Sequence, residues 1–558
     1  MTLNPEDILR SLDESQRAVA KQLIGPVVVR AGAGSGKTRA ITHRIAYGVQ
    51  TGVYAAEHVL AITYTRKAML EMKHRLRSLG ITGVTVNTIH AEAMQQLAAG
   101  WHKTTNSSLP ELILNNQPLL QEVAVEQGLA VNETSLERLA EEVDYRKVSL
   151  LTIEEYAAHA TATDRLRGDL DVADVLRVMQ AYEDRKLEQR LMDWNDVLSL
   201  TAGMLLHDPQ LLGEVHKKYR FFTVDEFQDI SPLQYELLNI WLGDRENICV
   251  VGDASQTIYS FSGANQRFLL DFGREHPLAQ EFLLQQNYRS AAEIVTSANT
   301  LIADRPGALT LSAVRGRSGY PVRGAVFETR SEEVQAVLTA ISADLKSGIK
   351  PSEIAILART SFDLTEFAAA LRANGIACET KTDIPFFSAQ EIMKFTALLQ
   401  QYSSHAHADS PAHTERLLAE IMHAVSGSTK TPESIRLTAV LGEFERLAGE
   451  SRVSLNAFRK HLNELENAGL SPAMEQVRLL TIHAAKGLEW SRVYLVNATD
   501  SSLPNRRAHS KQAVAEERRL AYVAITRARD VLRISLAQEG QEKPSRFLRE
   551  AKIPVSYF

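Results

Sequence analysis

The chain has 558 residues, of which 44% are hydrophobic and 23% charged, with a formal net charge of −6. That length predicts about three to five domains, and the composition excludes a disordered or fibrous protein. No apolar run is long enough for a membrane helix, and no basic leader precedes an apolar core, so we expect a cytoplasmic protein without a membrane partner. Cys249 and Cys378 lie in apolar runs, which predicts core positions and excludes a disulfide framework or a cysteine zinc site.

Short apolar runs typical of β-strands alternate with longer helical patterns in two regions. The predicted strands are 27–30, 59–64, 221–225 and 248–252 in the first region, and 281–284, 321–327, 353–357, 477–482 and 493–496 in the second. This alternation predicts an α/β fold with two parallel sheets covered by helices.

Each region is interrupted by a segment with helical periodicity. We expect a first sheet domain at 1–104 plus 191–280, its helical insertion at 105–190, a second sheet domain at 281–387 plus 475–558, and its shortened insertion at 388–474. The polar stretch 403–413 contains three histidines but no nearby cysteine, so a loop is favoured over a metal site.

A glycine-rich turn follows the first predicted strand. Glycines let backbone N–H groups surround phosphates, and a helix starting near Lys37 adds its positive end. Lys37 would reach the outer phosphates of ATP, and Thr38 would hold Mg²⁺. Alone, such a turn can be an ordinary strand-to-helix connection. The candidate nucleotide-binding residues are Ala31, which replaces the usual first glycine, Gly32, Ala33, Gly34, Ser35, Gly36, Lys37, Thr38 and Arg39.

Two further strand ends carry candidate catalytic residues. Asp225 would complete the Mg²⁺ shell, and Glu226 would deprotonate the attacking water. Paired acids are often solvated turn residues, but the phosphate turn argues for hydrolysis. Gln256 could sense the terminal phosphate, while Tyr259 and Phe261 could stack on nucleobases or belong to the core.

Seven more segments, in chain order, make the sequence similar to superfamily 1 helicases of the UvrD/PcrA/Rep type. They are 12–16, 61–68, 87–90, 192–196, 287–289, 481–490 (Thr-Ile-His-Ala-Ala-Lys-Gly-Leu-Glu-Trp) and 516–529. The resemblance implies two RecA-like P-loop NTPase domains. It also implies that Gln16 reads adenine, that Tyr288 stacks on it, and that Lys486 and Glu489 belong to the segment joining nucleotide to DNA.

The resemblance completes a catalytic set and a DNA-binding set. With Arg289 on the terminal phosphate and Arg527 as the arginine finger, the catalytic residues are Lys37, Asp225, Glu226, Gln256, Arg289 and Arg527. The implied DNA-binding residues are Tyr64, Thr65, Lys67, Thr88, His90, Tyr259, Phe261 and His483. Both histidines could instead be structural. Because these sets draw on both sheet domains, ATP is expected to pull the domains together and drive steps along one strand.

Several features depart from the family pattern or leave alternatives open. Ser262 stands where many relatives have arginine, and Ala254 where many have an acid. Segments 258–264 and 479–490 are most similar to those of actinobacterial UvrD-type helicases. The tetracysteine and HRDC modules of those helicases are absent from this sequence, which suggests a piece of a longer protein or a minimal form. Residues 504–552 hold twelve Lys/Arg and six acids, for either a solvated face or polyanion contact.

The expected function is an ATP- and Mg²⁺-dependent translocase on single-stranded DNA and a 3′→5′ helicase acting in DNA repair or recombination. Single-stranded and tailed duplex DNA are the expected partners, without sequence specificity and with strong salt dependence. The short second insertion keeps open an alternative, an ATP-switched DNA-binding remodeller that displaces or loads proteins, together with an unidentified protein partner. A small-molecule kinase is a distant third reading.

Overall fold

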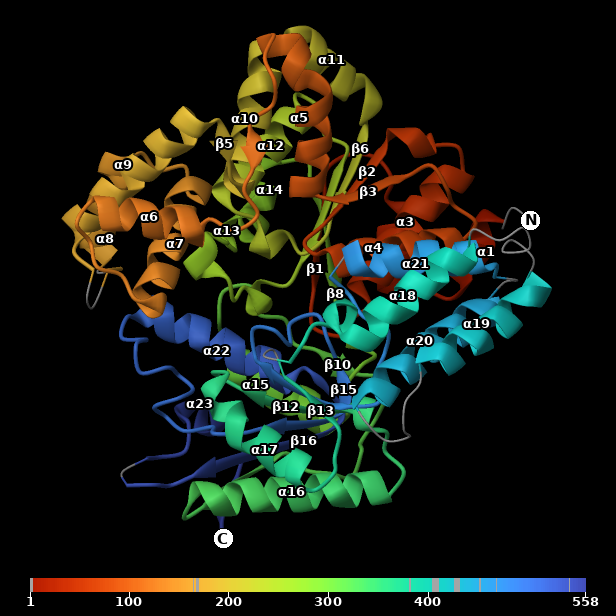
Figure 1. Ribbon diagram of the computed structural model, residues 1–558, viewed down its shortest axis with the longest axis vertical. Helices are drawn as coiled ribbons and strands as arrows, with labels where there is room; N and C mark the ends of the chain where they lie inside the picture. The colour runs from red at the N-terminus through yellow and green to blue at the C-terminus, as the bar shows by residue number, and fades with distance from the viewer. Residues whose placement is uncertain are drawn as a thin grey trace. The chain divides into compact units, whose positions relative to one another are not determined.

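The computed structural model describes residues 4–163, 165–166, 170–380, 383–403, 411–425, 432–450, 453–467, 469–540 and 542–558. Most of the histidine-bearing stretch 403–413 lies outside them. Two compact units form, Met1–Gln285 with Arg305–Leu309, and Gln286–Asp304 with Thr310–Phe558 (Figure 1). In the described part of the chain, no helix combines the length and apolarity needed to cross a membrane.

The first unit is built on a six-stranded parallel sheet in the order β3-β2-β6-β7-β1-β8. Its strands are β1 Val27–Ala31, β2 Val59–Thr63, β3 Thr85–Thr88, β6 Phe221–Val224, β7 Ile248–Gly252 and β8 Gln280–Leu284. Successive residues enter two different cores. Val27 and Val29 pack on one face and Val28 on the other, which explains why the strands read as continuous apolar runs.

Helices cover both faces of this sheet. The helices are α1 Pro5–Arg10, α2 Glu14–Lys21, α3 Lys37–Gln50, α4 Arg66–Ser78, α5 Ile89–Thr105, α10 Trp194–His207, α11 Pro209–Lys218, α12 Pro232–Leu242, α13 Arg267–Leu270 and α14 Phe272–Glu275. Residues of α2, α3 and α4 share the core of Val27, whereas residues of α5, α10 and α12 share the core of Val28.

Between α5 and α10 the chain forms a helical layer with its own core. Its helices are α6 Gln117–Glu126, α7 Glu133–Val148, α8 Ile153–Thr163 and α9 Val172–Gln189. Tyr156, Val178 and Tyr182 are buried there. The chain enters through β4 Glu111–Leu112 and returns through β5 Leu191–Met192, and these two short strands pair in parallel.

The second unit contains a seven-stranded parallel sheet in the order β13-β14-β12-β15-β16-β11-β17. The strands are β11 Arg323–Phe327, β12 Ile354–Ala358, β13 Cys378–Glu379, β14 Val477–Thr481, β15 Trp490–Leu495, β16 Ala528–Ala537 and β17 Val555–Tyr557; β9 Gln286–Asn287 pairs separately with β10 Ser312–Ala313. The helices associated with it are α15 Ala292–Ile302, α16 Arg330–Lys346, α17 Thr365–Ala373, α22 Lys511–Ile525 and α23 Arg546–Glu550. Two parallel sheets therefore confirm the predicted α/β fold.

A second helical layer lies between β13 and β14. It consists of α18 Gln390–Ser403, α19 Pro411–Val425, α20 Pro432–Glu450 and α21 Leu455–Asn467. Ile392, Phe395, Ile421 and Phe458 form part of its core. The residue boundaries predicted for the two insertions remain predictions.

Two sequence assignments need correction. Residues 281–284 do not open the second sheet, because β8 pairs with β1 at the edge of the first sheet and Gly32 N donates to Leu284 O at 3.1 Å. The apolar run identified a strand but held no information about its neighbour. Cys249 is buried as expected, whereas Cys378 is only partly buried. Among the strands of the two large sheets, β3, β13, β16 and β17 were not predicted.

Candidate active site and nucleic-acid interface

The phosphate turn connects β1 to α3. Gly34 and Gly36 have φ angles of 70° and 78°, a region that glycine enters without strain. Ser35 N and Oγ both donate to Gly32 O, at 3.2 and 2.8 Å. Ala31 is the last residue of β1, where extended backbone accommodates a side chain. Alanine at this position is therefore compatible with the turn.

Two predicted nucleotide-binding side chains hold the turn in place. Gln16 Nε2 donates to Ser35 O at 2.9 Å, and a Cβ at Gly36 would lie 2.6 Å from that nitrogen. Arg39, in the first turn of α3, donates to Ser11 O at 2.8 Å. Both residues thus have structural partners, and adenine recognition by Gln16 remains a prediction.

The two predicted carboxylates meet the phosphate turn where β6 ends. Thr38 Oγ1 donates to Asp225 Oδ2 at 3.4 Å, and Lys37 Nζ lies 3.5 Å from Glu226 Oε1. Glu226 has a φ of 53°, and its backbone N–H donates to Asp225 Oδ1 at 2.9 Å. The turn thus directs Asp225 towards Thr38 and Glu226 towards Lys37. These different contacts suit the two carboxylates to different roles.

The electrostatics of this cluster favour a bound cation. Burial, reinforced by the charge of Glu226, raises the pKa of Asp225 to about 7 although Lys37 opposes the shift. Burial would lower the pKa of Lys37, but Glu226, Asp253 and Asp225 together raise it. Within the described residues no group of three or more His, Cys, Asp or Glu forms a complete metal site. Mg²⁺ held by Thr38 and Asp225 would therefore complete its shell with phosphate oxygens and water.

A side chain without a predicted role connects these carboxylates to β7. Gln228 Nε2 donates to Glu226 Oε2 at 2.5 Å, and Gln228 Oε1 accepts from Asp253 N at 3.0 Å. Gln256 Nε2 donates to Asp253 Oδ2 at 2.7 Å. Gln228 belongs to the same segment as Asp225, but only the fold shows that it bridges two strand ends.

The same edge of the sheet carries the predicted DNA-binding threonines. Thr65 follows β2 and accepts from Ala68 N at 3.1 Å, capping α4; Thr88 ends β3 and accepts from Ala91 N at 3.2 Å, capping α5. Because β2 and β3 are neighbours, two helix N-termini begin side by side, an arrangement that suits backbone phosphates. Lys67 is exposed in the first turn of α4.

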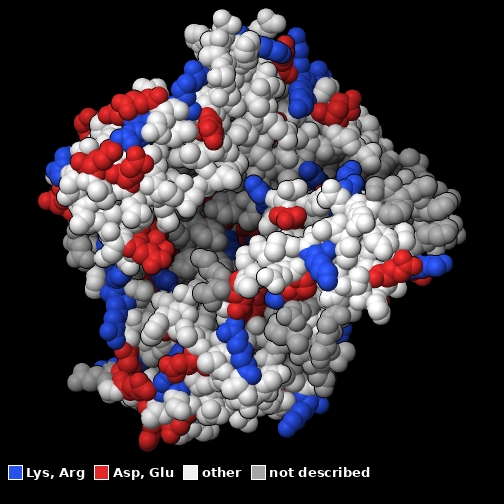
Figure 2. Space-filling model, viewed as in Figure 1, with Lys and Arg blue, Asp and Glu red and all other residues white. Residues whose placement is uncertain are grey.

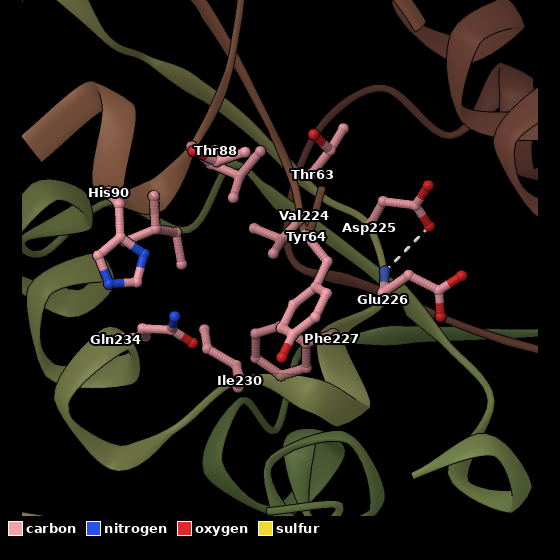
Figure 3. Close-up of a pocket in the computed structure, with 12 residues that line it drawn as sticks. Thr63, Tyr64, Thr88, His90, Val224, Asp225, Glu226, Phe227, Ile230 and Gln234 are labelled. Atoms are coloured by element: carbon pink, nitrogen blue, oxygen red, sulfur yellow. Dashed lines mark hydrogen bonds between the residues drawn. The ribbon is translucent and has the colours of Figure 1, made fainter. Parts of the chain in front are cut away.

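A cavity at this edge is lined both by predicted DNA-binding residues and by the two carboxylates. Figure 3 shows Tyr64, Thr88 and His90 around the same space as Asp225 and Glu226. Burial lowers the pKa of His90 to about 4, and its ring meets Trp194 edge-on with centroids 6.1 Å apart. A neutral histidine would contact DNA by hydrogen bonding or packing.

The predicted aromatic platform is assembled from two segments. The rings of Tyr64 and Tyr259 stack with centroids 5.7 Å apart, and Tyr259 meets Phe261 edge-on at 6.2 Å. Tyr64 is 39% exposed and Phe261 43%. This exposure favours base stacking over a core role for both rings.

In the second unit the predicted nucleotide-binding residues contact one another or nearby backbone. Arg289 Nε pairs with Glu489 Oε2 at 2.5 Å, and the adjacent Tyr288 is 40% exposed. Arg527 donates from Nε to Val523 O and from Nη1 to Leu488 O, both at 3.0 Å. The guanidinium groups are thus oriented by acceptors of their own unit.

His483 follows β14 in the segment that also contains Lys486. Burial, with the charges of Arg359 and Lys486 adding to it, lowers the pKa of His483 to about 4. His483, like His90, is therefore neutral at pH 7.

Part of the basic excess of residues 504–552 is paired with carboxylates. Arg506 pairs with Glu542 at 2.6 Å, Arg518 with Glu550 at 2.5 Å, and Arg546 with Asp500 at 2.7 Å; Arg529 pairs with Glu353. These pairs offset part of the basic excess and leave both predicted interpretations, a solvated face and polyanion contact, in place.

Comparison with known proteins agrees with this arrangement. The family model of the UvrD/REP helicase N-terminal domain matches residues 12–277, and that of the UvrD-like helicase C-terminal domain matches 282–410 and 429–539. ATP-dependent DNA helicase UvrD2 of Mycobacterium tuberculosis is 37% identical, over 98% of this chain and 82% of that protein. ATP-dependent DNA helicase Rep of Escherichia coli is 27% identical, over 97% and 94%. UvrD1 of M. tuberculosis is 28% identical, over 98% and 85%.

Proposed function

Because the chain belongs to the UvrD/Rep family of ATP-dependent DNA helicases, we propose that it moves 3′→5′ along single-stranded DNA and separates duplexes in repair or recombination. The observation that carries the proposal is the shared edge of the first sheet. There, the Lys37–Glu226 and Thr38–Asp225 contacts lie next to the two capped helix starts that follow β2 and β3.

The hydrolytic roles follow from the contacts. The turn 31–36 would surround the phosphates of ATP, and Lys37 would offset the negative charge that develops on the terminal phosphoryl group. Glu226, oriented by Gln228, would accept a proton from the attacking water. Mg²⁺, when bound at Thr38 and Asp225, supplies positive charge to the phosphates. Arg289 and Arg527 would contribute guanidinium donors from the second unit.

DNA binding would use the strand ends beside the hydrolytic cluster. Tyr64 and Phe261 would stack on bases, and the helix starts at Thr65 and Thr88 would bind the backbone. Stacking and backbone contacts ignore base identity, so affinity should depend on salt more than on sequence.

Two assays test the proposal: ATP hydrolysis with and without single-stranded DNA, and displacement of a strand from duplexes carrying a 3′ or a 5′ tail. The proposal expects DNA-stimulated hydrolysis and displacement only from the 3′-tailed duplex. Stimulation without displacement would leave a translocase that needs a partner. Hydrolysis that ignores DNA would overturn the motor and favour the ATP-switched remodeller. Lys37→Ala serves as the hydrolysis-deficient control.

A further inference from the structure

The loop that carries Phe261 is held by the helical layer α6–α9. Arg165, which follows α8, donates from Nη2 to Phe261 O at 2.8 Å. Two residues further along the loop, a Cβ at Gly263 would lie 2.5 Å from Val148 Cγ2 of α7, so glycine permits close approach. Two separate contacts thus bind one short loop, Tyr259–Gly263, to the helical layer.

Arg165 is itself fixed by several partners. Its Nε lies 2.6 Å from Glu142 Oε2, and its Cζ lies 3.4 Å from the centroid of the Tyr145 ring. Its backbone N–H donates to Ala160 O at 3.1 Å, and its carbonyl accepts from Arg138 at 3.0 Å. An arginine held in this way loses little further freedom when it binds the loop.

The carboxylate that holds Arg165 is buried. Glu142 is 4% exposed, and its Oε2 also accepts from Tyr156 Oη at 2.8 Å. A charge-assisted pair between a buried carboxylate and a guanidinium is strong and directional. The contact between Arg165 and Phe261 is therefore anchored inside the helical layer rather than on its surface.

The other end of the same segment reaches the hydrolytic cluster. Asp253 N donates to Gln228, and Gln228 donates to Glu226. The segment from Asp253 to Phe261 thus connects an internal end beside Glu226 with an exposed end at Phe261. A loop fixed at both ends can transmit a displacement of its aromatic rings, whereas a loop free at one end would absorb it.

We propose that Arg165 is a positioning residue that holds the Phe261 loop against the helical layer and so couples DNA stacking to ATP hydrolysis. This inference rests on the proposed function as a DNA-stimulated ATPase. Direct phosphate binding by Arg165 is the competing role. The guanidinium already has three partners, and acidic side chains gather over α6–α9 on the face shown in Figure 2, which disfavours a DNA phosphate there.

The test compares Arg165→Ala, Arg165→Lys and the control Arg185→Ala in the 558-residue chain. Arg185 belongs to the same helical layer, where it pairs with Glu122 and Glu126. Hydrolysis is measured without DNA and across a series of single-stranded DNA concentrations. Base stacking is followed by the fluorescence quenching of 2-aminopurine in the DNA, with Phe261→Ala as the reference for lost stacking.

For Arg165→Ala we expect unchanged hydrolysis without DNA, a five- to tenfold loss of DNA stimulation, and 2-aminopurine quenching as weak as in Phe261→Ala. Arg165→Lys should recover part of both, because an ammonium can donate to Phe261 O. Arg185→Ala should behave as wild type. Wild-type stimulation and quenching in Arg165→Ala would overturn the inference, as would an equal loss in Arg185→Ala. A loss of affinity with normal quenching would assign Arg165 to phosphate binding instead. Absence of stimulation in the wild-type protein would refute the proposed function itself.

Discussion

The polar edges of the two sheets differ in how they hold the residues proposed to act on ATP. In the first unit, Lys37 Nζ lies 3.5 Å from Glu226 Oε1, and burial, with the charge of Glu226 adding to it, raises the pKa of Asp225. In the second unit, Arg289 pairs with Glu489 and Arg527 donates to backbone carbonyls. The residues of the first unit thus form a cluster rich in negative charge, whereas the two arginines of the second unit are held by acceptors of that unit. If Arg527 acts as the proposed arginine finger, its guanidinium must exchange these backbone acceptors for phosphate oxygens.

The most damaging change should be Lys37→Ala, because it removes the cation proposed to bind phosphate, together with its ion pair to Glu226. We expect kcat for ATP hydrolysis to fall about 10³-fold. Single-stranded DNA binding, measured by fluorescence anisotropy, should remain. Lys21→Ala, at the exposed end of α2, is the control. Undiminished phosphate release from Lys37→Ala would remove the turn 31–38 from catalysis.

A comparison of Arg527→Lys with Arg529→Lys tests the proposed role of Arg527 as the arginine finger. A lysine cannot reproduce the several donors of a guanidinium, so we expect kcat to fall about 10²-fold for Arg527→Lys. Arg529 pairs with Glu353 and has no proposed role in hydrolysis. Arg529→Lys should therefore lower kcat by less than about threefold. The measurement is steady-state hydrolysis with saturating DNA. Equal effects of the two substitutions would contradict the special role of Arg527.

The orientation of Glu226 is expected to depend on Gln228. In Gln228→Ala, Glu226 loses a donor and Asp253 N loses its acceptor, so we expect kcat to fall about tenfold with little change in the KM for ATP. A thermal unfolding scan separates this effect from loss of structure. A raised KM with normal kcat would show that Gln228 serves nucleotide binding rather than orientation of Glu226.

The smallest effect concerns acid stability. Because burial holds the pKa of His90 at about 4 in the folded protein, below its usual value of 6.5, the unfolded chain binds more protons between these pH values. Stability therefore falls as pH decreases from 6.5 towards 4. His90→Asn should reduce the loss between pH 7 and pH 5 by about 1–2 kcal/mol. Urea unfolding at pH 7 and pH 5, followed by tryptophan fluorescence, measures the free energy of unfolding. An identical loss of this free energy in the wild type and in His90→Asn would contradict the lowered pKa of His90.

The sequence predicted most of what depends on local pattern. The phosphate turn and the carboxylates at 225 and 226 each occupy one continuous segment, so their roles could be inferred before their contacts were known. Strand pairing was less accessible. The run 281–284 is equally apolar beside either sheet, and β16 was missed because charged residues such as Arg529, Asp530 and Arg533 interrupt its apolar pattern.

Contacts between distant segments could not be predicted from pattern. The bridge through Gln228 joins two strand ends, and Arg165 meets Phe261 across 96 positions of sequence. The basic excess after residue 504 was open to two interpretations, a solvated face or polyanion contact, and the acidic partners of Arg518 and Arg546 became known only from the fold. Composition counts charges but cannot show which of them are already neutralised.

The helical layer α6–α9 is attached to the first sheet by buried charge. Lys147 Nζ lies 2.7 Å from Asp193 Oδ2, and Lys186 Nζ lies 2.6 Å from Asp196 Oδ2. The two lysines outweigh the effect of burial and lower the pKa of Asp193. Removing one partner of such a cluster is costly, because the remaining charge stays buried.

This attachment has a consequence for protein engineering. Since β4 and β5 bring the two ends of the layer together, a shortened chain that replaces the layer by a brief linker is geometrically reasonable. The shortened chain would also need Asp193→Asn and Asp196→Asn, because removal of α6–α9 would remove their partners Lys147 and Lys186. Asparagine caps helices as well as aspartate does, so α10 would keep its start while the shortened chain lost its uncompensated charge.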